Sequence, residues 1–180
     1  MTQLSDLVGT WNIDPAHSVV GFSLKHAMIS TVRGSFGDFA GTINVTGPTT
    51  ADVNVSIKAD SITTNNEQRD GHLKSADFFE TETYPEMTFV STGVKDIDDE
   101  EFVLVGDLTI RGVTKPVELE AEFVGTQVDP QGMLRAGFEA KTTINRKDFG
   151  LTWNAALETG GVLVSDKIKI AIDVAAVKQA

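Results

Sequence analysis

The sequence predicts a single all-β domain, built as a barrel or a sandwich of about eight antiparallel strands. Three observations support this fold class. Most of the chain alternates apolar with polar residues, as half-buried strands do. Turn-forming residues separate the alternating runs, and one segment alone carries helical spacing. With 180 residues and neither a repeat nor a linker, the chain is most simply one domain spanning residues 1–180.

The alternating runs give the predicted strands in order. They cover residues 18–28, 39–45, 53–59, 87–94, 102–110, 117–124, 134–144 and 167–174. In the first run Val20, Phe22, Leu24, His26 and Met28 share one face, and in the last run isoleucines recur at every second position. An error of one residue in register would exchange the two faces of a strand.

Turns are predicted between these runs. Residues 129–132 read Asp-Pro-Gln-Gly, and residues 47–48 are Gly-Pro. Residues 111–116 are interpreted as a turn, and the acidic run at 95–101 as a solvated one. Gly41 has two readings: it leaves room inside a barrel, or it marks a bulge in its strand.

The segment from Asn66 to Phe79 breaks the strand pattern. Arg69 and His72 are spaced for one face of a short helix, and Asn65 or Asn66 can cap its start. One interpretation is that the two basic side chains pin the helix to carbonyl groups at the barrel rim. The other is that they bind an anionic or polar head group, since the forked donors of arginine suit phosphate or quinone oxygens. A second short helical stretch is weakly indicated near residues 155–158.

Composition excludes several functions. There are 15 Lys and Arg residues against 26 Asp and Glu, a net charge of −11, which argues against nucleic-acid binding. The absence of cysteine excludes disulfides and thiolate chemistry. His17, His26 and His72 lack metal-ligand spacing, so no metal site is expected. No nucleophile motif is present, and no catalytic residue is predicted.

A basic and aromatic cluster follows the strand at 134–144. Asn145 and Arg146 precede Phe149 and Trp153 in what is expected to be a loop at the barrel rim. The two aromatic side chains either close the mouth of a pocket or fill one end of the core.

The chain resembles the YceI-like, polyisoprenoid-binding family from Trp11 to Val177. Four segments carry the resemblance: IDPAHSVVGFSLKHAM with RGSFGDFAG, NEQRDGHLKSADFFETETYP, GDLTIRGVTKPV, and INRKDFGLTWN with VSDKIKIAID. It implies an extended lipocalin-like, eight-stranded antiparallel barrel with one or two short helices. It also implies an isoprenoid chain in an apolar interior, with its head group near the helix-bearing end.

From this resemblance we expect a non-enzymatic protein that binds, sequesters or transports a polyprenyl phosphate or an isoprenoid quinone, with no required cofactor. The expected head-group contacts are Arg69, His72, Asn145 and Arg146. The expected tail pocket is Phe22, Leu24, His26, Met28, Phe36, Phe39, Val55, Ile57, Phe89, Phe138, Phe149, Trp153, Ile170 and Ile172.

Two alternatives stay open: an enzyme acting on an apolar substrate with His26 or His72 as acid or base, and a solid, ligand-free barrel that serves interaction or stress response. Transient membrane contact and a homodimer are further expectations. Residues 1–11 show no basic patch followed by an apolar run, so we expect a cytoplasmic protein, or a periplasmic or secreted one if a leader has been removed.

Overall fold

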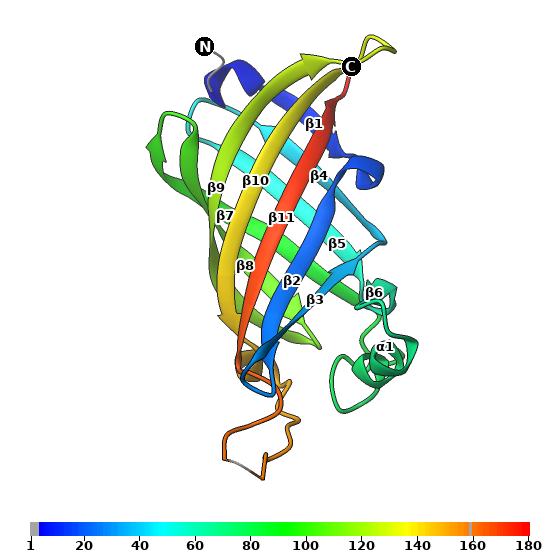
Figure 1. Ribbon diagram of the computed structural model, residues 1–180. Helices are drawn as coiled ribbons and strands as arrows, with labels where there is room; N and C mark the ends of the chain where they lie inside the picture. Colours follow the sequence, from blue (N-terminus) through cyan, green and yellow to red (C-terminus); the bar gives the residue numbers. More distant parts are fainter. Residues whose placement is uncertain (1–3, 159) are drawn as a thin grey trace.

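The protein is a closed antiparallel β-barrel, shown in Figure 1 as a computed structural model that describes residues 4–158 and 160–180. The strands are β1 (Gly9–Ile13), β2 (Val19–His26), β3 (Ser30–Phe36), β4 (Phe39–Val45), β5 (Ala51–Lys58), β6 (Ile62–Thr63), β7 (Glu86–Asp98), β8 (Glu101–Ile110), β9 (Val113–Val128), β10 (Leu134–Asn145) and β11 (Lys167–Lys178). The α-helix is α1 (Glu67–Lys74), and the 3₁₀ helices are η1 (Leu4–Leu7), η2 (Pro15–His17), η3 (Ala59–Ser61) and η4 (Arg146–Phe149).

Eight strands close the barrel. Their order is β1, β4, β5, β7, β8, β9, β10 and β11, and β1 returns to pair with β11. The predicted eight-stranded antiparallel barrel is therefore confirmed. Both termini lie at one end of the barrel, and α1 lies at the other, here called the helix-bearing end (Figure 1).

The strand that closes the barrel is divided in two. β1 pairs with the last part of β11, from Ala176 to Lys178, whereas β2 pairs with its earlier part, from Lys169 to Asp173. β1 is bonded to β4 on its other side, but β2 is bonded to β3. The β2–β3 hairpin consequently leaves the closed barrel toward the helix-bearing end, with β6 at its edge (Figure 1).

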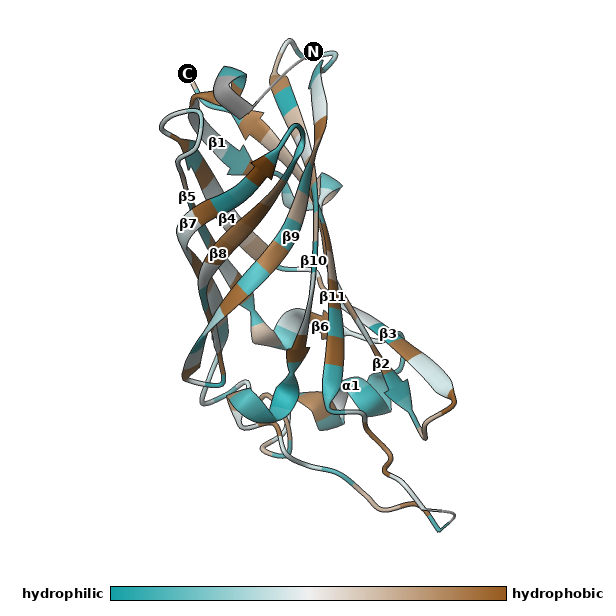
Figure 2. Ribbon diagram, turned by 90° about the vertical axis from the view of Figure 1, so that its left-hand side faces the viewer, coloured by the Kyte–Doolittle hydropathy of each residue, from teal (hydrophilic) through white to brown (hydrophobic). Residues whose placement is uncertain are grey.

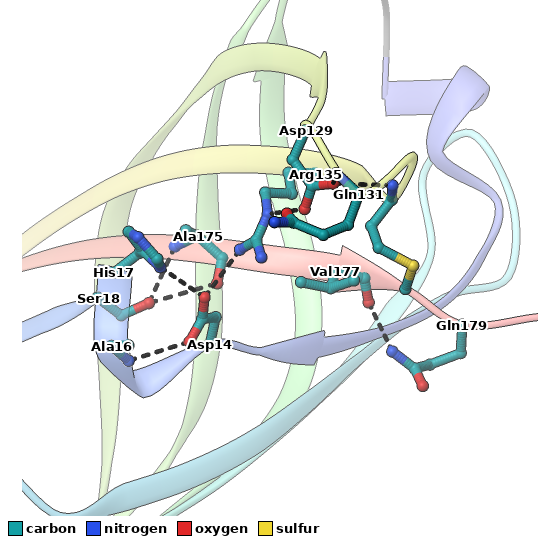
Figure 3. Close-up of polar contacts among 11 residues, drawn as sticks. Asp14, Ala16, His17, Ser18, Asp129, Gln131, Arg135, Ala175, Val177 and Gln179 are labelled. Carbon is teal, nitrogen blue, oxygen red and sulfur yellow. Dashed lines mark hydrogen bonds and ion pairs between the residues drawn. The ribbon is translucent and has the colours of Figure 1, made fainter.

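The break between β1 and β2 falls at η2, and a polar cluster holds it (Figure 3). Asp14 caps η2 by accepting a hydrogen bond from the Ala16 amide, and proline at the first helical position lacks the amide that a strand ladder needs. Ser18 exchanges hydrogen bonds with the backbone of Ala175 on β11. The division of the strand therefore rests on the local cap of η2 and on the contact of Ser18 with β11.

Hydrophobic and hydrophilic residues alternate along the strands (Figure 2). At the end that carries the termini, Trp11 and Leu7 are almost fully buried, and the Trp11 indole donates a hydrogen bond to the Leu7 carbonyl. At the helix-bearing end Phe36, Phe78 and Phe149 belong to a second buried cluster. Each end of the barrel thus has its own apolar seal, built around aromatic rings.

The structure corrects several sequence predictions. β1, β3 and β6 were not predicted, because short runs containing glycine and polar residues give little alternation. The turn predicted at 111–116 ends by Gly112, and β9 already includes Pro116. The weakly indicated helix near 155–158 is wrong: Ala156 pairs with Val162, and Leu163 donates to the Ala155 carbonyl, so residues 155–156 pair with 162–163.

Gly41 fits neither of its two readings. The β4–β5 ladder runs without interruption through the Gly41–Val55 pair, so no bulge occurs there. A Cβ on Gly41 would lie 2.8 Å from Ile13 Cδ1 and 2.9 Å from the Asn54 carbonyl oxygen. The space that a side chain would take is therefore filled by neighbours.

Among the described residues, no helix is long and apolar enough to cross a membrane.

Candidate functional site

The barrel encloses a cavity of about 400 Å³ whose wall is almost entirely apolar. Its lining on β11 runs from Ile168 to Val174, a length of roughly 20 Å at the rise of a β-strand. The barrel is therefore not filled by its own side chains, and the space is elongated. Its volume lies within the ~300–1,000 Å³ typical of small-molecule pockets.

Thirteen of the fourteen predicted tail-pocket residues line this cavity. They are Phe22, Leu24, His26, Phe36, Phe39, Val55, Ile57, Phe89, Phe138, Phe149, Trp153, Ile170 and Ile172. Alternation along the strands indicated the inner face for most of them, whereas Phe149 and Trp153 were predicted as aromatic residues of a rim loop. Their contact with a ligand stays a prediction.

Met28 is the exception, and its prediction is wrong. The β2 pattern extends only to His26, after which Ala27 and Met28 adopt positive φ angles of 52° and 67° in the turn to β3. The turn carries Met28 out of the barrel, where it is 61% exposed. Extending a two-residue period beyond the end of a strand placed it on the wrong side.

Sequence reasoning also missed part of the lining. Leu104 and Leu108 on β8, with Val117 and Leu119 on β9, face the cavity. Their alternation was visible in the sequence, so the signal was present. Phe78 and Phe79 follow α1 in an irregular segment and also line the cavity, but no period in the sequence could assign their direction.

Local contacts fix α1 and the direction of Arg69. Asn66 caps the helix by accepting from the Arg69 amide. The Arg69 side chain donates from Nε to Thr64 Oγ1 at 2.8 Å and from Nη2 to the Thr64 carbonyl at 2.9 Å. Within the described part of the chain Nη1 has no hydrogen-bond partner, and Arg69 lines the cavity. The residue therefore both anchors the helix and keeps donors for another group.

Asp70 completes this anchor. It accepts from the amide and from the hydroxyl of buried Thr64, at 2.8 and 2.5 Å. Burial opposes its charge, but the Thr64 hydrogen bonds with the nearby Arg69 prevail, and the pKa of Asp70 is lowered. A charged Asp70 holds Thr64 in position for Arg69.

His72 lies in an aromatic setting at the same end. Its ring meets Trp153 edge-on at 4.8 Å and Phe78 at 5.1 Å between centroids. Nε2 is 2.8 Å from the Asp77 carboxylate, which fixes the ring from outside while it lines the cavity. One end of the cavity is therefore lined by Arg69, His72 and Trp153, although Trp153 is distant from the other two in sequence.

Arg146 and Asn145 are not placed as predicted. Arg146 is buried, and its guanidinium donates to the carbonyls of Leu151, Trp153, Val164 and Ser165. It touches the cavity wall, but its donors hold the 151–165 segment together. Burial lowers its pKa, while Asp166 acts in the opposite sense. Asn145 is exposed, outside the lining, and caps η4 by accepting from the Lys147 amide.

Other cavity features bear on chemistry. The ionisable lining residues are His26, Arg69, His72, Arg146 and Asp173, and the last is exposed on the outer side of β11. Among the residues that the structure describes, no group of three or more His, Asp or Glu side chains could hold a metal ion. His26 and His72 both face the space in which an apolar molecule would lie.

Comparison with known proteins identifies the family. Residues 11–176 match the YceI-like domain. The chain belongs to this family. Protein YceI of Escherichia coli O157:H7 is 47% identical over 137 residues, which are 75% of this chain and 71% of that protein. A UPF0312 protein of Photorhabdus laumondii is 47% identical over 149 residues, 81% of this chain and 77% of the relative.

Solved structures share the YceI-like barrel. The Campylobacter jejuni YceI protein is 36% identical, with a TM-score of 0.74 over 93% of this chain and 96% of its own. BcnA of Burkholderia cenocepacia has a TM-score of 0.79 at 21% identity, covering 91% and 98%. A polyisoprenoid binding domain from Saccharophagus degradans has a TM-score of 0.70 at 16% identity, covering 94% and 98%. The last two show the fold alone.

Proposed function

We propose that this YceI-like protein binds an isoprenoid lipid, a polyprenyl phosphate or an isoprenoid quinone, with the tail inside the barrel. The observation that carries the proposal is the elongated apolar cavity with Arg69 and His72 at one end. A long hydrocarbon chain fits such a space better than a compact polar molecule does. The polyisoprenoid-binding domain of Saccharophagus degradans, which has the same fold, adds support.

Burial of the tail supplies the affinity. Each methylene moved from water into an apolar wall gains about 0.8 kcal/mol, so a few isoprene units suffice for tight binding. Phe22 and Phe89 form part of this wall, and each ring lies over a glycine of the neighbouring strand, Gly34 and Gly106. The glycines let the rings lie flat against the sheet, which keeps the centre of the barrel open.

The polar end of the lipid is assigned to Arg69 and His72. Arg69 keeps Nη1 for a ligand while Thr64 holds the rest of its guanidinium, so the side chain is already oriented before binding. His72 is fixed by Asp77 and by the Trp153 ring. A phosphate or quinone oxygen at this end would receive charge-assisted hydrogen bonds.

Mass spectrometry of the intact native protein, with extraction and identification of lipid, tests the proposal. We expect one isoprenoid per chain, either co-purified or taken up from added polyprenyl phosphate or menaquinone. Arg69→Gln with His72→Gln should weaken binding of polyprenyl phosphate about tenfold, since charge-assisted hydrogen bonds are lost. Binding of the uncharged polyprenol should change little.

Lys58→Gln, on the outer side of β5, is the control and should leave both affinities unchanged. A protein that neither carries nor takes up any of these lipids contradicts the proposal. Equal loss for the phosphate and for the polyprenol would instead remove Arg69 and His72 from the head-group site. Conversion of the recovered lipid would favour the enzyme alternative.

A further inference from the structure

An exposed apolar tip stands at the helix-bearing end. It consists of Met28 and Ile29 in the β2–β3 turn and of Val162, which pairs with Ala156; they are 61%, 85% and 43% exposed. Ile29 is among the most solvent-exposed large apolar side chains of the described residues. Apolar side chains gathered at one protruding point need an explanation beyond ordinary surface composition.

The tip is one connected structure. The Ala27 amide donates to the Leu163 carbonyl at 2.7 Å, and His26 forms a bridge with Val164. Met28 packs against Gly161 so closely that a Cβ there would collide with its sulfur. The two segments therefore present their apolar side chains together, and both segments lie at the helix-bearing end (Figure 1).

The tip is also continuous with the cavity. Leu24, His26 and Val32 of the same hairpin line the cavity, and so does Leu163 between Val162 and Val164. The two segments that carry the exposed tip thus also form the adjacent part of the cavity wall. A molecule leaving the cavity past these residues would meet apolar surface and not open water.

A basic patch flanks the tip. Ser23 pairs with Arg33 on one side and with Lys169 on the other, so these two cations share the outer face of the sheet. One row nearer the tip, Lys25 pairs with Thr31, and Lys167 pairs with Asn145 on β10. All four cations are exposed. The patch is defined as Lys25, Arg33, Lys167 and Lys169.

This patch inverts the charge of the molecule locally. The whole chain carries −11, yet the outward positions of these two cross-strand rows carry no acidic residue. The acids nearest in sequence are Asp166, Asp173 and Asp38; Asp166 is paired with Lys147, and Asp173 lies on the outer face of β11, four residues beyond Lys169. A positive surface beside an apolar tip is complementary to lipid head groups that carry negative charge.

We propose that this end docks on an anionic lipid bilayer, with the apolar tip inserted among the head groups and the basic patch against the phosphates. The apolar seal of this end then faces the membrane, and an isoprenoid that passes it moves between bilayer and barrel without crossing water. The proposal rests on the proposed function for the cargo, but membrane docking is measured independently of it. Amphipathic surfaces of this kind bind reversibly and respond to ionic strength.

Vesicle co-sedimentation of the full chain tests docking. We expect binding to phosphatidylcholine vesicles that contain phosphatidylglycerol, weaker binding to pure phosphatidylcholine, and loss of the difference at high salt. Ile29→Asp with Val162→Asp should reduce binding by more than about tenfold, and Lys167→Gln with Lys169→Gln by a similar factor. Both pairs lie outside the cavity lining.

Controls come from the opposite end. Val128→Asp changes another exposed valine, on β9, and Lys95→Gln with Lys178→Gln removes two cations away from the patch. These variants should bind vesicles as the wild type does. Equal binding of wild type to anionic and neutral vesicles, or full binding by the tip variants, would overturn the proposal.

A second measurement separates the two proposals. In detergent micelles, where no bilayer is involved, the tip variants should bind polyprenyl phosphate with wild-type affinity but extract it slowly from vesicles. Absence of lipid binding in detergent by every protein would contradict the proposed function and leave the vesicle result standing. Normal extraction by the tip variants would contradict docking alone.

Discussion

Asp14 and Arg135 are 121 residues apart in the chain, and Arg135 Nη1 donates to Asp14 Oδ2 at 2.8 Å. Arg135 also donates from Nε to Asp129 Oδ2 at 2.7 Å, in the turn between β9 and β10. The guanidinium thus ties the break between β1 and β2 to the start of β10 and the turn before it (Figure 3). Since β1 closes the barrel, this contact helps to hold the barrel closed.

Without this contact, the free energy of unfolding should change less as the pH is lowered. The hydrogen bond from Arg135, with another from His17, lowers the pKa of Asp14 from 3.8 to about 2. Stabilisation by Asp14 is therefore fully present above about pH 4 and is lost as the pH falls through about 2. Asp14→Asn should cost about 1 kcal/mol at neutral pH, allowing for solvent screening.

Urea unfolding across this pH range measures the effect. The free energies of unfolding of Asp14→Asn and wild type should converge as the pH approaches 2. Asp52→Asn, at an exposed position of β5, serves for comparison. A constant difference at every pH would show that the carboxylate charge contributes nothing.

Arg146→Leu should destabilise the protein by about 3 kcal/mol, because several backbone carbonyls lose their buried donor. Arg146→Lys should recover only part of this, since an ammonium group cannot reproduce the planar fork of donors. Chemical denaturation measures both. Lys147→Leu, at the exposed neighbouring position, should stay within about 0.5 kcal/mol of wild type. Weaker lipid binding with unchanged stability would return Arg146 to the head-group site.

Ala140→Phe should fill the cavity and displace the lipid. Ala140 lies on β10 opposite Ile172 and lines the cavity, so a phenyl ring there occupies the path of a tail. Thr143→Phe adds the same ring on the exposed side of β10 and should keep the lipid. Native mass spectrometry gives the occupancy, and near-ultraviolet circular dichroism confirms folding. Undiminished occupancy in Ala140→Phe would place the tail elsewhere.

Gly106→Ala should destabilise the barrel by about 1–3 kcal/mol, as overpacking does. A Cβ at Gly106 would meet the ring of Phe89 and lie 2.7 Å from the Val90 carbonyl oxygen. Gly93→Ala, also within the sheet, meets no atom within 4 Å and should have little effect. Thermal unfolding of the two variants compares them directly; similar midpoints would mean that Phe89 can move aside.

The seal at the helix-bearing end shows where sequence reasoning stopped. Arg69 and His72 were predicted from helical spacing, and the structure places both against the cavity. Arg146 was predicted by the same chemistry, a basic residue beside aromatic ones, but η4 turns it inward to carbonyls of its own loop. Spacing predicts which side chains of one helix share a face, but it does not predict which residues of another segment contact that face.

The sequence by itself determined the inner and outer faces of the long strands, because a two-residue period and the burial of apolar surface leave one consistent arrangement. It also narrowed the cap of α1 to Asn65 or Asn66, because capping depends on residues at the start of the helix. Only the tertiary structure decided that β1 closes the barrel, that Met28 leaves it, and that Trp153 meets His72. These depend on contacts between residues far apart in the chain, whose free energy no local pattern records.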